Sequence, residues 1–312
     1  MKIRIGLYQD LFAGGEALAD GSFAALLEGA ARADQLGLDL FWIDVDVKSR
    51  RQGDALVLQA CAAAAMRTSA LRLLAGPVLL PLHNPLRVAE DVATLDALAG
   101  GRLELVFASA RGSPFDAPRA DDLEEEITLL RRAWSCQTLE HRGRLHTYTG
   151  IDVHPKPLQD GGPPLWIEAG VDLRDAAGSL PGPRAVEVLS RLELGLVLSS
   201  LDAAIDFHTG LTRSGEPEGG SLEGDAGRPT RLALRLPWLV DRDSGSPGFG
   251  SGRLRAITPD AARREIARAI DRLAGLMELD LFLPCAASGP SPEQWLRSTE
   301  WVASQLGPAL GV

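Results

Sequence analysis

Cysteine and histidine are scarce in this sequence, and their scarcity excludes several kinds of site. The three cysteines, Cys61, Cys136 and Cys285, are odd in number and lie far apart. They form neither a disulfide framework nor a metal-binding spacing, and they suit a reducing compartment. The five histidines do not combine with Asp or Glu at metal-ligand spacing, and no Gly-x-Ser-x-Gly elbow is present. We therefore expect no metal site.

The sequence also has fewer positively than negatively charged residues, and it has no long apolar run. Lys and Arg total 32 against 42 Asp and Glu, which gives a net charge of −10. A chain of this charge is a poor partner for nucleic acid, because phosphate binding needs concentrated positive charge. No apolar run approaches the ~18 residues of a membrane span. The opening MKIRIGLYQD enters a strand pattern without a signal-peptide region. We expect a cytoplasmic protein with no membrane partner.

A regular alternation of strands and helices is what the sequence does contain. Eight apolar strands, each followed by a helix, are expected across the 312 residues. The strands are predicted at 2–8, 38–45, 71–80, 103–107, 163–169, 194–198, 231–240 and 279–283. This pattern predicts an α/β fold, a (β/α)8 TIM barrel that occupies residues 1–312 as a single domain. The alternative, a doubly wound open sheet, lacks a Gly-x-Gly-x-x-Gly after the first strand.

Several connections are too long for a minimal barrel and predict insertions after strands 4, 5, 6 and 7. Residues 137–162 form a long polar segment that we expect to be irregular; it contains His141, His146 and His154. The segments 214–229 and 243–252 are rich in Gly and are expected to be surface loops. The three histidines of the first insertion are candidates for approaching the active-site pocket.

The stretch from Leu71 to Gly112 gives the clearest local prediction. Two apolar strands flank a helix that begins at Pro85, with Asn84 as its N-cap. Apolar residues recur at helical spacing in this helix, at Val88, Val92, Leu95 and Leu98. A strand, a crossover helix and a second buried strand make a parallel unit.

The same stretch resembles the signature of the bacterial luciferase-like flavin-dependent monooxygenases. The residues that match the recurring pattern are Leu80, Pro81, Pro85, Arg87, Ala89, Glu90, Leu95, Asp96, Gly101 and Arg102. We interpret most of them as structural, with Asp96 and Arg102 paired across the helix–strand turn. A second match, HPKPLQDGGPPLW, precedes the fifth strand. The resemblance covers essentially the whole chain and also implies a barrel.

The resemblance implies a monooxygenase or oxidoreductase that uses reduced FMN or a deazaflavin on a small organic substrate. A flavin reductase would supply the reduced cofactor. The family also forms dimers through the helices expected here at 54–66 and 85–99. We therefore expect a homodimer, or a heterodimer with a homologous barrel. The substrate itself is not indicated by the sequence.

Candidate cofactor residues follow from the rule that barrel chemistry lies at the C-terminal ends of the strands. Arg111, between Ala110 and Gly112, follows strand four, where an arginine can bind phosphate bidentately and a glycine permits close approach. Family members use an arginine at this position for the flavin phosphate. The other interpretation of Arg111 is a rim arginine paired with Asp116 or Asp121.

Two further cofactor positions are implied by the resemblance. Gly76-Pro77 ends strand three, where family members commonly have a cis peptide that supports the flavin ring. We therefore predict a cis Gly76-Pro77 bond. If the loop after strand five carries an insertion, Ser179 lies just before a helix start and suits a phosphate. Read without the insertion, Gly170-Val171 replaces the expected serine.

The residues after strand two leave two functions open. Family members typically have an acidic residue and one or two histidines there, whereas this chain has Asp44, Val45, Asp46 and Val47. Asp46 replaces the histidine as catalytic base if the protein is an enzyme. The alternative is a catalytically inactive barrel that serves as partner subunit of a homologous monooxygenase.

Overall fold

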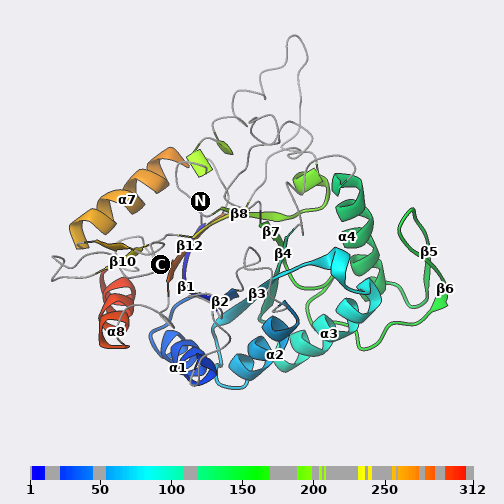
Figure 1. Cartoon of the computed structure of the whole chain (residues 1–312), viewed down its shortest axis with the longest axis horizontal. Coiled ribbons are helices and arrows are strands. Elements are labelled where there is room, and N and C mark those ends of the chain that lie inside the picture. Colours follow the sequence, from blue (N-terminus) through cyan, green and yellow to red (C-terminus); the bar gives the residue numbers. More distant parts are fainter. Residues whose placement is uncertain are drawn as a thin grey trace, which may run out of the picture.

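The computed structural model describes most of the elements that build the fold (Figure 1). The described residues are 2–10, 22–44, 54–108, 119–168, 188–198, 204–205, 207–208, 231–235, 238–240, 255–257, 259–273, 278–284 and 292–306. The barrel strands lie at the centre of the molecule and helices surround them (Figure 1).

Eight parallel strands close into a barrel in the order β1-β12-β9-β8-β7-β4-β3-β2. These strands are β1 (Lys2–Asp10), β2 (Leu40–Asp44), β3 (Arg72–Val78), β4 (Leu103–Ala108), β7 (Leu165–Glu168), β8 (Gly195–Leu198), β9 (Arg231–Arg235) and β12 (Glu278–Pro284). Each strand overlaps one of the eight predicted from the sequence. The predicted TIM barrel is therefore confirmed.

Helices cover the outside of the barrel. Those described in full are α1 (Ser22–Gln35), α2 (Asp54–Ala65), α3 (Pro85–Leu98), α4 (Arg119–Ser135), α7 (Pro259–Arg272) and α8 (Pro292–Trp301), with a short 3-10 helix at η2 (Leu80–Leu82) and a π-helix at η3 (Val302–Leu306). Helix α3 begins as predicted, because the Asn84 side chain accepts hydrogen bonds from the backbone N–H groups of Leu86 and Arg87. Such a cap satisfies amides that have no partner within the helix.

Alternating side chains divide the core into two shells. The outward residues of the strands pack against the helices and form one large cluster. The inward residues form a second cluster of Tyr8, Leu40, Trp42, Leu74, Val106, Trp166, Val197, Ala233 and Phe282. A Cβ on Gly195 would lie 2.1 Å from the Trp166 ring, so a glycine is needed beside this large side chain. The barrel is thus filled by side chains, as expected for this fold.

The predicted seventh strand, 231–240, is shorter in the structure. Only β9 joins the barrel, while β10 (Trp238–Val240) pairs with β11 (Arg255–Ile257) in a separate two-stranded parallel sheet. Pro237 lies between the two pieces and has no backbone N–H to give to a ladder. Residues 231–240 therefore contribute strands to two sheets instead of one.

The expected irregular segment at 137–162 instead contains an antiparallel hairpin, β5 (Leu139–Arg142) and β6 (Thr147–Ile151), which lies outside α4 (Figure 1). One carboxylate of α4 holds its turn. Glu125 accepts backbone hydrogen bonds from Arg144, Leu145 and His146 at 2.8–3.0 Å and lies 3.1 Å from His141 Nε2. Burial opposes the charge, but these partners outweigh it and lower the pKa of Glu125 to about 2.

Glu125→Gln is expected to destabilise the protein by about 1–2 kcal/mol at pH 7, because the hairpin loses a charged acceptor. A carboxyl whose folded pKa is lowered stabilises the fold above its unfolded pKa of about 4.3, and this stabilisation is lost as the pH falls toward 2. The difference from wild type should therefore shrink between pH 7 and pH 3 in urea unfolding. Glu124→Gln, which removes only a partly exposed pair with Arg191, is the control. An unchanged difference at both pH values would contradict a role for the charge.

Candidate functional site

The C-terminal ends of the strands form the barrel mouth, the end at which enzymes of this fold carry their chemistry. Following the inward alternation to the ends of four strands gives Asp44, Gly76, Ala108 and Glu168. Asp44 is buried, with only 2% of its surface exposed, and Glu168 is partly exposed. Among the described residues, the inward side chains at this mouth thus include two carboxylates and no histidine. Carboxylates there are suited to proton transfer.

Strand β3 departs from regular pairing as it reaches the mouth. Ala75 pairs with Leu105 and Val78 with Phe107, so Gly76 and Pro77 lie opposite the single residue Val106. This is the arrangement of a β-bulge, which re-aims the backbone and is common beside active sites. The Gly76-Pro77 peptide is cis, as predicted.

Gly76 is required by both its conformation and its surroundings. Its φ of +142° is one that L side chains rarely adopt. A Cβ there would lie 2.3 Å from the Val106 carbonyl oxygen. Gly76 and Pro77 are both buried. The bulge therefore presents bare backbone and a proline ring, packed closely on β4.

Trp42 of β2 holds the Gly76 peptide from inside the barrel. Its Nε1 donates a hydrogen bond of 2.9 Å to the Gly76 carbonyl oxygen. The indole is fully buried, with its ring centroid 5.4 Å from Phe282 in an edge-to-face contact and 6.2 Å from Tyr8. Sequence reasoning missed Trp42. Its signal was a tryptophan at an inward strand position, since a buried indole N–H usually finds a partner.

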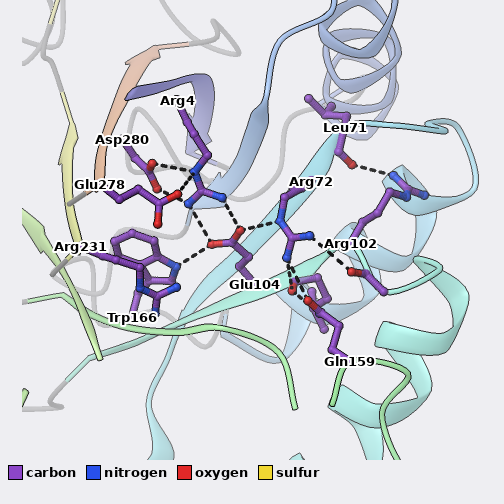
Figure 2. A network of polar contacts seen from close by, with 12 residues as sticks. Arg4, Leu71, Arg72, Arg102, Glu104, Gln159, Trp166, Arg231, Glu278 and Asp280 are labelled. Atoms are coloured by element: carbon purple, nitrogen blue, oxygen red, sulfur yellow. Dashed lines mark hydrogen bonds and ion pairs between the residues drawn. The ribbon is translucent and has the colours of Figure 1, made fainter. Parts of the chain in front are cut away.

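The opposite end of the barrel is closed by a network of charged side chains (Figure 2). Arg4 of β1 donates to Asp280 at 2.8 and 2.5 Å and to Glu104 at 2.8 Å. Glu104 also accepts from Arg72 Nε at 2.6 Å and from Trp166 Nε1 at 2.8 Å. All of these residues lie near the starts of their strands. The network separates the apolar interior from solvent at the end away from the mouth.

The two buried carboxylates of this network, Glu104 and Asp280, have pKa values shifted in opposite directions. Burial would raise the pKa of Glu104, but Arg4 and Arg72 outweigh it and hold that pKa below its usual value. Burial raises the pKa of Asp280 to about 7, and the nearby Glu104 and Glu278 add to the increase while Arg4 opposes it. Asp280 is therefore the member of the network that accepts a proton most readily.

The predicted pair of Asp96 and Arg102 does not form, and that prediction was wrong. Buried Asp96 instead accepts hydrogen bonds from the backbone N–H and the side chain of Gln159, at 2.9 and 2.7 Å. Arg102 donates to the carbonyl of Leu71 at 2.7 Å (Figure 2). It also donates to both oxygens of Thr68. Gln159 belongs to the second sequence match, so both matched segments meet here in a structural role.

Two histidines of the first insertion, His141 and His146, lie on the hairpin beyond α4, and exposed His154 follows it; none lies at the mouth. His141 contacts Glu125, and the His146 ring stacks on Tyr148 with centroids 5.9 Å apart. In the part of the chain that the structure describes, no group of His, Cys, Asp and Glu is arranged to hold a metal ion.

The predicted site residues divide into two groups. The structure places Gly76 and Pro77 at the mouth, on the bulge of β3. The others lie outside the described residues; they are Asp46, Ala110, Arg111, Gly112 and Ser179. No helix within the described ranges has the length and apolar character to span a bilayer.

Comparison with known proteins identifies the family to which this barrel belongs. The family model for the luciferase-like monooxygenases matches residues 4–177. The chain belongs to that family. Its barrel resembles the oxygenating constituent of 3,6-diketocamphane monooxygenase from Pseudomonas putida, solved in complex with FMN, with a TM-score of 0.68 and 14% identity over 99% of both chains.

Two curated relatives use different cofactors. The oxygenase component of the flavin-dependent trigonelline monooxygenase of Acinetobacter baylyi is 30% identical over 114 residues, which are 34% of this chain and 31% of that protein. The F420-dependent glucose-6-phosphate dehydrogenase of Amycolatopsis mediterranei is 29% identical over 160 residues, 46% of this chain and 47% of that protein. The matches thus span from about a third to about half the length of these relatives.

Proposed function

We propose that the protein binds reduced FMN or a deazaflavin at the barrel mouth and acts on a small organic substrate as a monooxygenase or oxidoreductase. The observation that carries this proposal is the buried bulge at Gly76 and Pro77, which offers bare backbone at the end of β3. Membership of the luciferase-like monooxygenases supports it.

The described residues at the mouth fit a flat, largely apolar ring. Next to the bulge lie the aromatic side chains of Tyr8, Trp42 and Phe282, and Gly76 itself has no side chain. A flavin or deazaflavin, when bound, supplies the redox chemistry. The chain's own residues would orient the ring and exclude water. We propose Asp46 as the group that holds or moves the substrate proton, with buried Asp44 two residues before it at the end of β2.

The phosphate end of the cofactor would lie at the loops after strands four and five. Arg111 is proposed to bind the phosphate, with Ala110 and Gly112 allowing the backbone to approach and Ser179 adding a hydroxyl donor. The two relatives named above, one flavin-dependent and one F420-dependent, support a flavin and a deazaflavin about equally.

Two partners belong to the proposal. A separate flavin reductase would supply reduced cofactor, which fits the relative named as an oxygenase component. A second barrel, of this chain or a homologue, would pack on α2 and α3. Ala62 and Ala63, two small and partly exposed residues of α2, permit close helix contact. We propose that the protein acts in the cytoplasm.

Flavin titration of the purified protein tests the proposal, and Arg111→Ala tests its phosphate contact. Wild type is expected to quench the fluorescence of both FMN and riboflavin on binding. Arg111→Ala should weaken FMN binding by about tenfold or more and leave riboflavin binding unchanged, because only FMN carries the phosphate. Equal losses for both ligands would assign Arg111 a structural role.

The second candidate function, an inactive partner subunit, is favoured by the missing histidine after β2. It predicts tight association with a homologous barrel. Failure of the wild-type protein to bind FMN, riboflavin, their reduced forms or F420 would overturn the enzyme proposal and leave this candidate.

A further inference from the structure

We infer that Trp42 is a positioning residue for the cofactor, because its indole N–H fixes the orientation of the Gly76 peptide. This inference rests on the proposed function, in which the bulge of β3 contacts the flavin ring. Trp42 is not placed in direct contact with the cofactor. It acts through the backbone of the neighbouring strand.

The Gly76 carbonyl is a backbone group outside the regular strand pairing. On one side, β3 is last paired with β2 through Ala75 and Ile43. On the other, its register with β4 is interrupted between Ala75 and Val78. A buried carbonyl outside a ladder needs a hydrogen-bond donor from elsewhere. Trp42 Nε1 provides that donor at 2.9 Å.

The donor is itself held rigidly. The Trp42 side chain has no exposed surface and packs edge-to-face on Phe282, with an interplanar angle of 70°. The ring centroid of Tyr8 lies 6.2 Å from that of Trp42. Because this packing fixes the orientation of the indole, its N–H is directed at the Gly76 carbonyl oxygen.

Contact with Val106 fixes the other side of the same peptide. A Cβ added to Gly76 would lie 2.3 Å from the Val106 carbonyl oxygen and 2.8 Å from the Val106 Cβ. The backbone of Gly76 is therefore already in contact with β4. The peptide is thus held between a donor on β2 and the backbone of β4. Loss of the donor frees the carbonyl to turn, and the surface offered to a flat ligand changes with it.

Trp42→Phe removes the donor, and Trp166→Phe is the matched control. Trp166 is also a fully buried inward tryptophan, but its Nε1 donates to Glu104 at 2.8 Å, at the closed end of the barrel. Both variants lose one indole N–H and a similar volume. Titration with FMN and with riboflavin, together with thermal unfolding of the flavin-free proteins, compares them directly.

We expect Trp42→Phe to weaken the binding of FMN and riboflavin by the same factor, about tenfold, because the bulge contacts the ring that both ligands share. Trp166→Phe should change either affinity by less than about twofold. Trp42→Phe with wild-type affinities would overturn the inference and leave the proposed function intact. Equal losses in both variants would also overturn it, since a general loss of packing would explain them.

A second substitution covers the case in which Trp42→Phe does not fold. Benzothienylalanine at position 42 keeps the size and shape of the indole and replaces its N–H with sulfur. The same tenfold loss for both ligands supports the inference, and unchanged binding overturns it. Absence of flavin binding by the wild-type protein would be a different result, because it overturns the proposed function and the inference together.

Discussion

Glu104→Leu is expected to lower the free energy of unfolding by about 3–5 kcal/mol, because it leaves the buried guanidinium of Arg4 without one of its carboxylates. Glu104 accepts from Arg4, Arg72 and Trp166, and only 1% of its surface is exposed. No water can replace a partner so deeply buried at low cost. Equilibrium unfolding in urea at pH 7 measures the loss.

A partly exposed member of the same network provides the control. Glu278 lies 3.0 Å from Arg4, but its side chain is 16% exposed, so Glu278→Gln should cost less than about 1 kcal/mol. The double variant Arg4→Met with Glu104→Leu tests the cause. It removes the guanidinium that Glu104→Leu leaves with one carboxylate fewer, and Asp280, whose pKa burial raises, can take up a proton once Arg4 is gone. We expect the double variant to be more stable than Glu104→Leu alone. Equal instability would attribute the loss to packing instead.

The sequence predicts the barrel because each strand and helix carries its own local pattern. Apolar runs mark strands buried on both faces, and Asn84-Pro85 marks the start of α3 through chemistry confined to a few residues. The cis bond at Gly76-Pro77 was predicted from the family resemblance, and the structure confirms it. Features that depend on neighbouring residues in the chain were therefore accessible.

Features that depend on distant residues were not predicted. Three charged residues, Arg4, Glu104 and Asp280, lie in otherwise apolar strands. A charged side chain buried there needs a partner of opposite charge. Their partners, however, follow from the register of strands up to 276 residues apart. The hairpin outside α4 was missed for the same reason, since Glu125 holds a turn about 20 residues further along.

The candidate site is divided in the same way. Gly76 and Pro77 were predicted from the cis bond that family members have at the end of strand three, whereas Trp42 of β2 acts on the neighbouring β3 through a single hydrogen bond. That contact joins Trp42, which is in register with Leu74, to a carbonyl two residues further along β3, where the register with β4 is interrupted. Asp46, Ala110, Arg111, Gly112 and Ser179 lie outside the described residues, and their roles remain predictions.

Gly76→Ala is expected to destabilise the protein by about 3 kcal/mol or more, because the new methyl group meets backbone atoms that cannot move aside. Its Cβ would lie 2.3 Å from the carbonyl oxygen of Val106, in a residue with φ of +142°. Gly37→Ala separates the two causes. Gly37 also has positive φ, +72°, but nothing lies within 4 Å of its Cβ position, so it should lose only about 1–2 kcal/mol. Urea unfolding of both variants measures the difference. Equal losses would mean that the bulge of β3 shifts away from β4 at little cost, and that Val106 does not fix the Gly76 peptide.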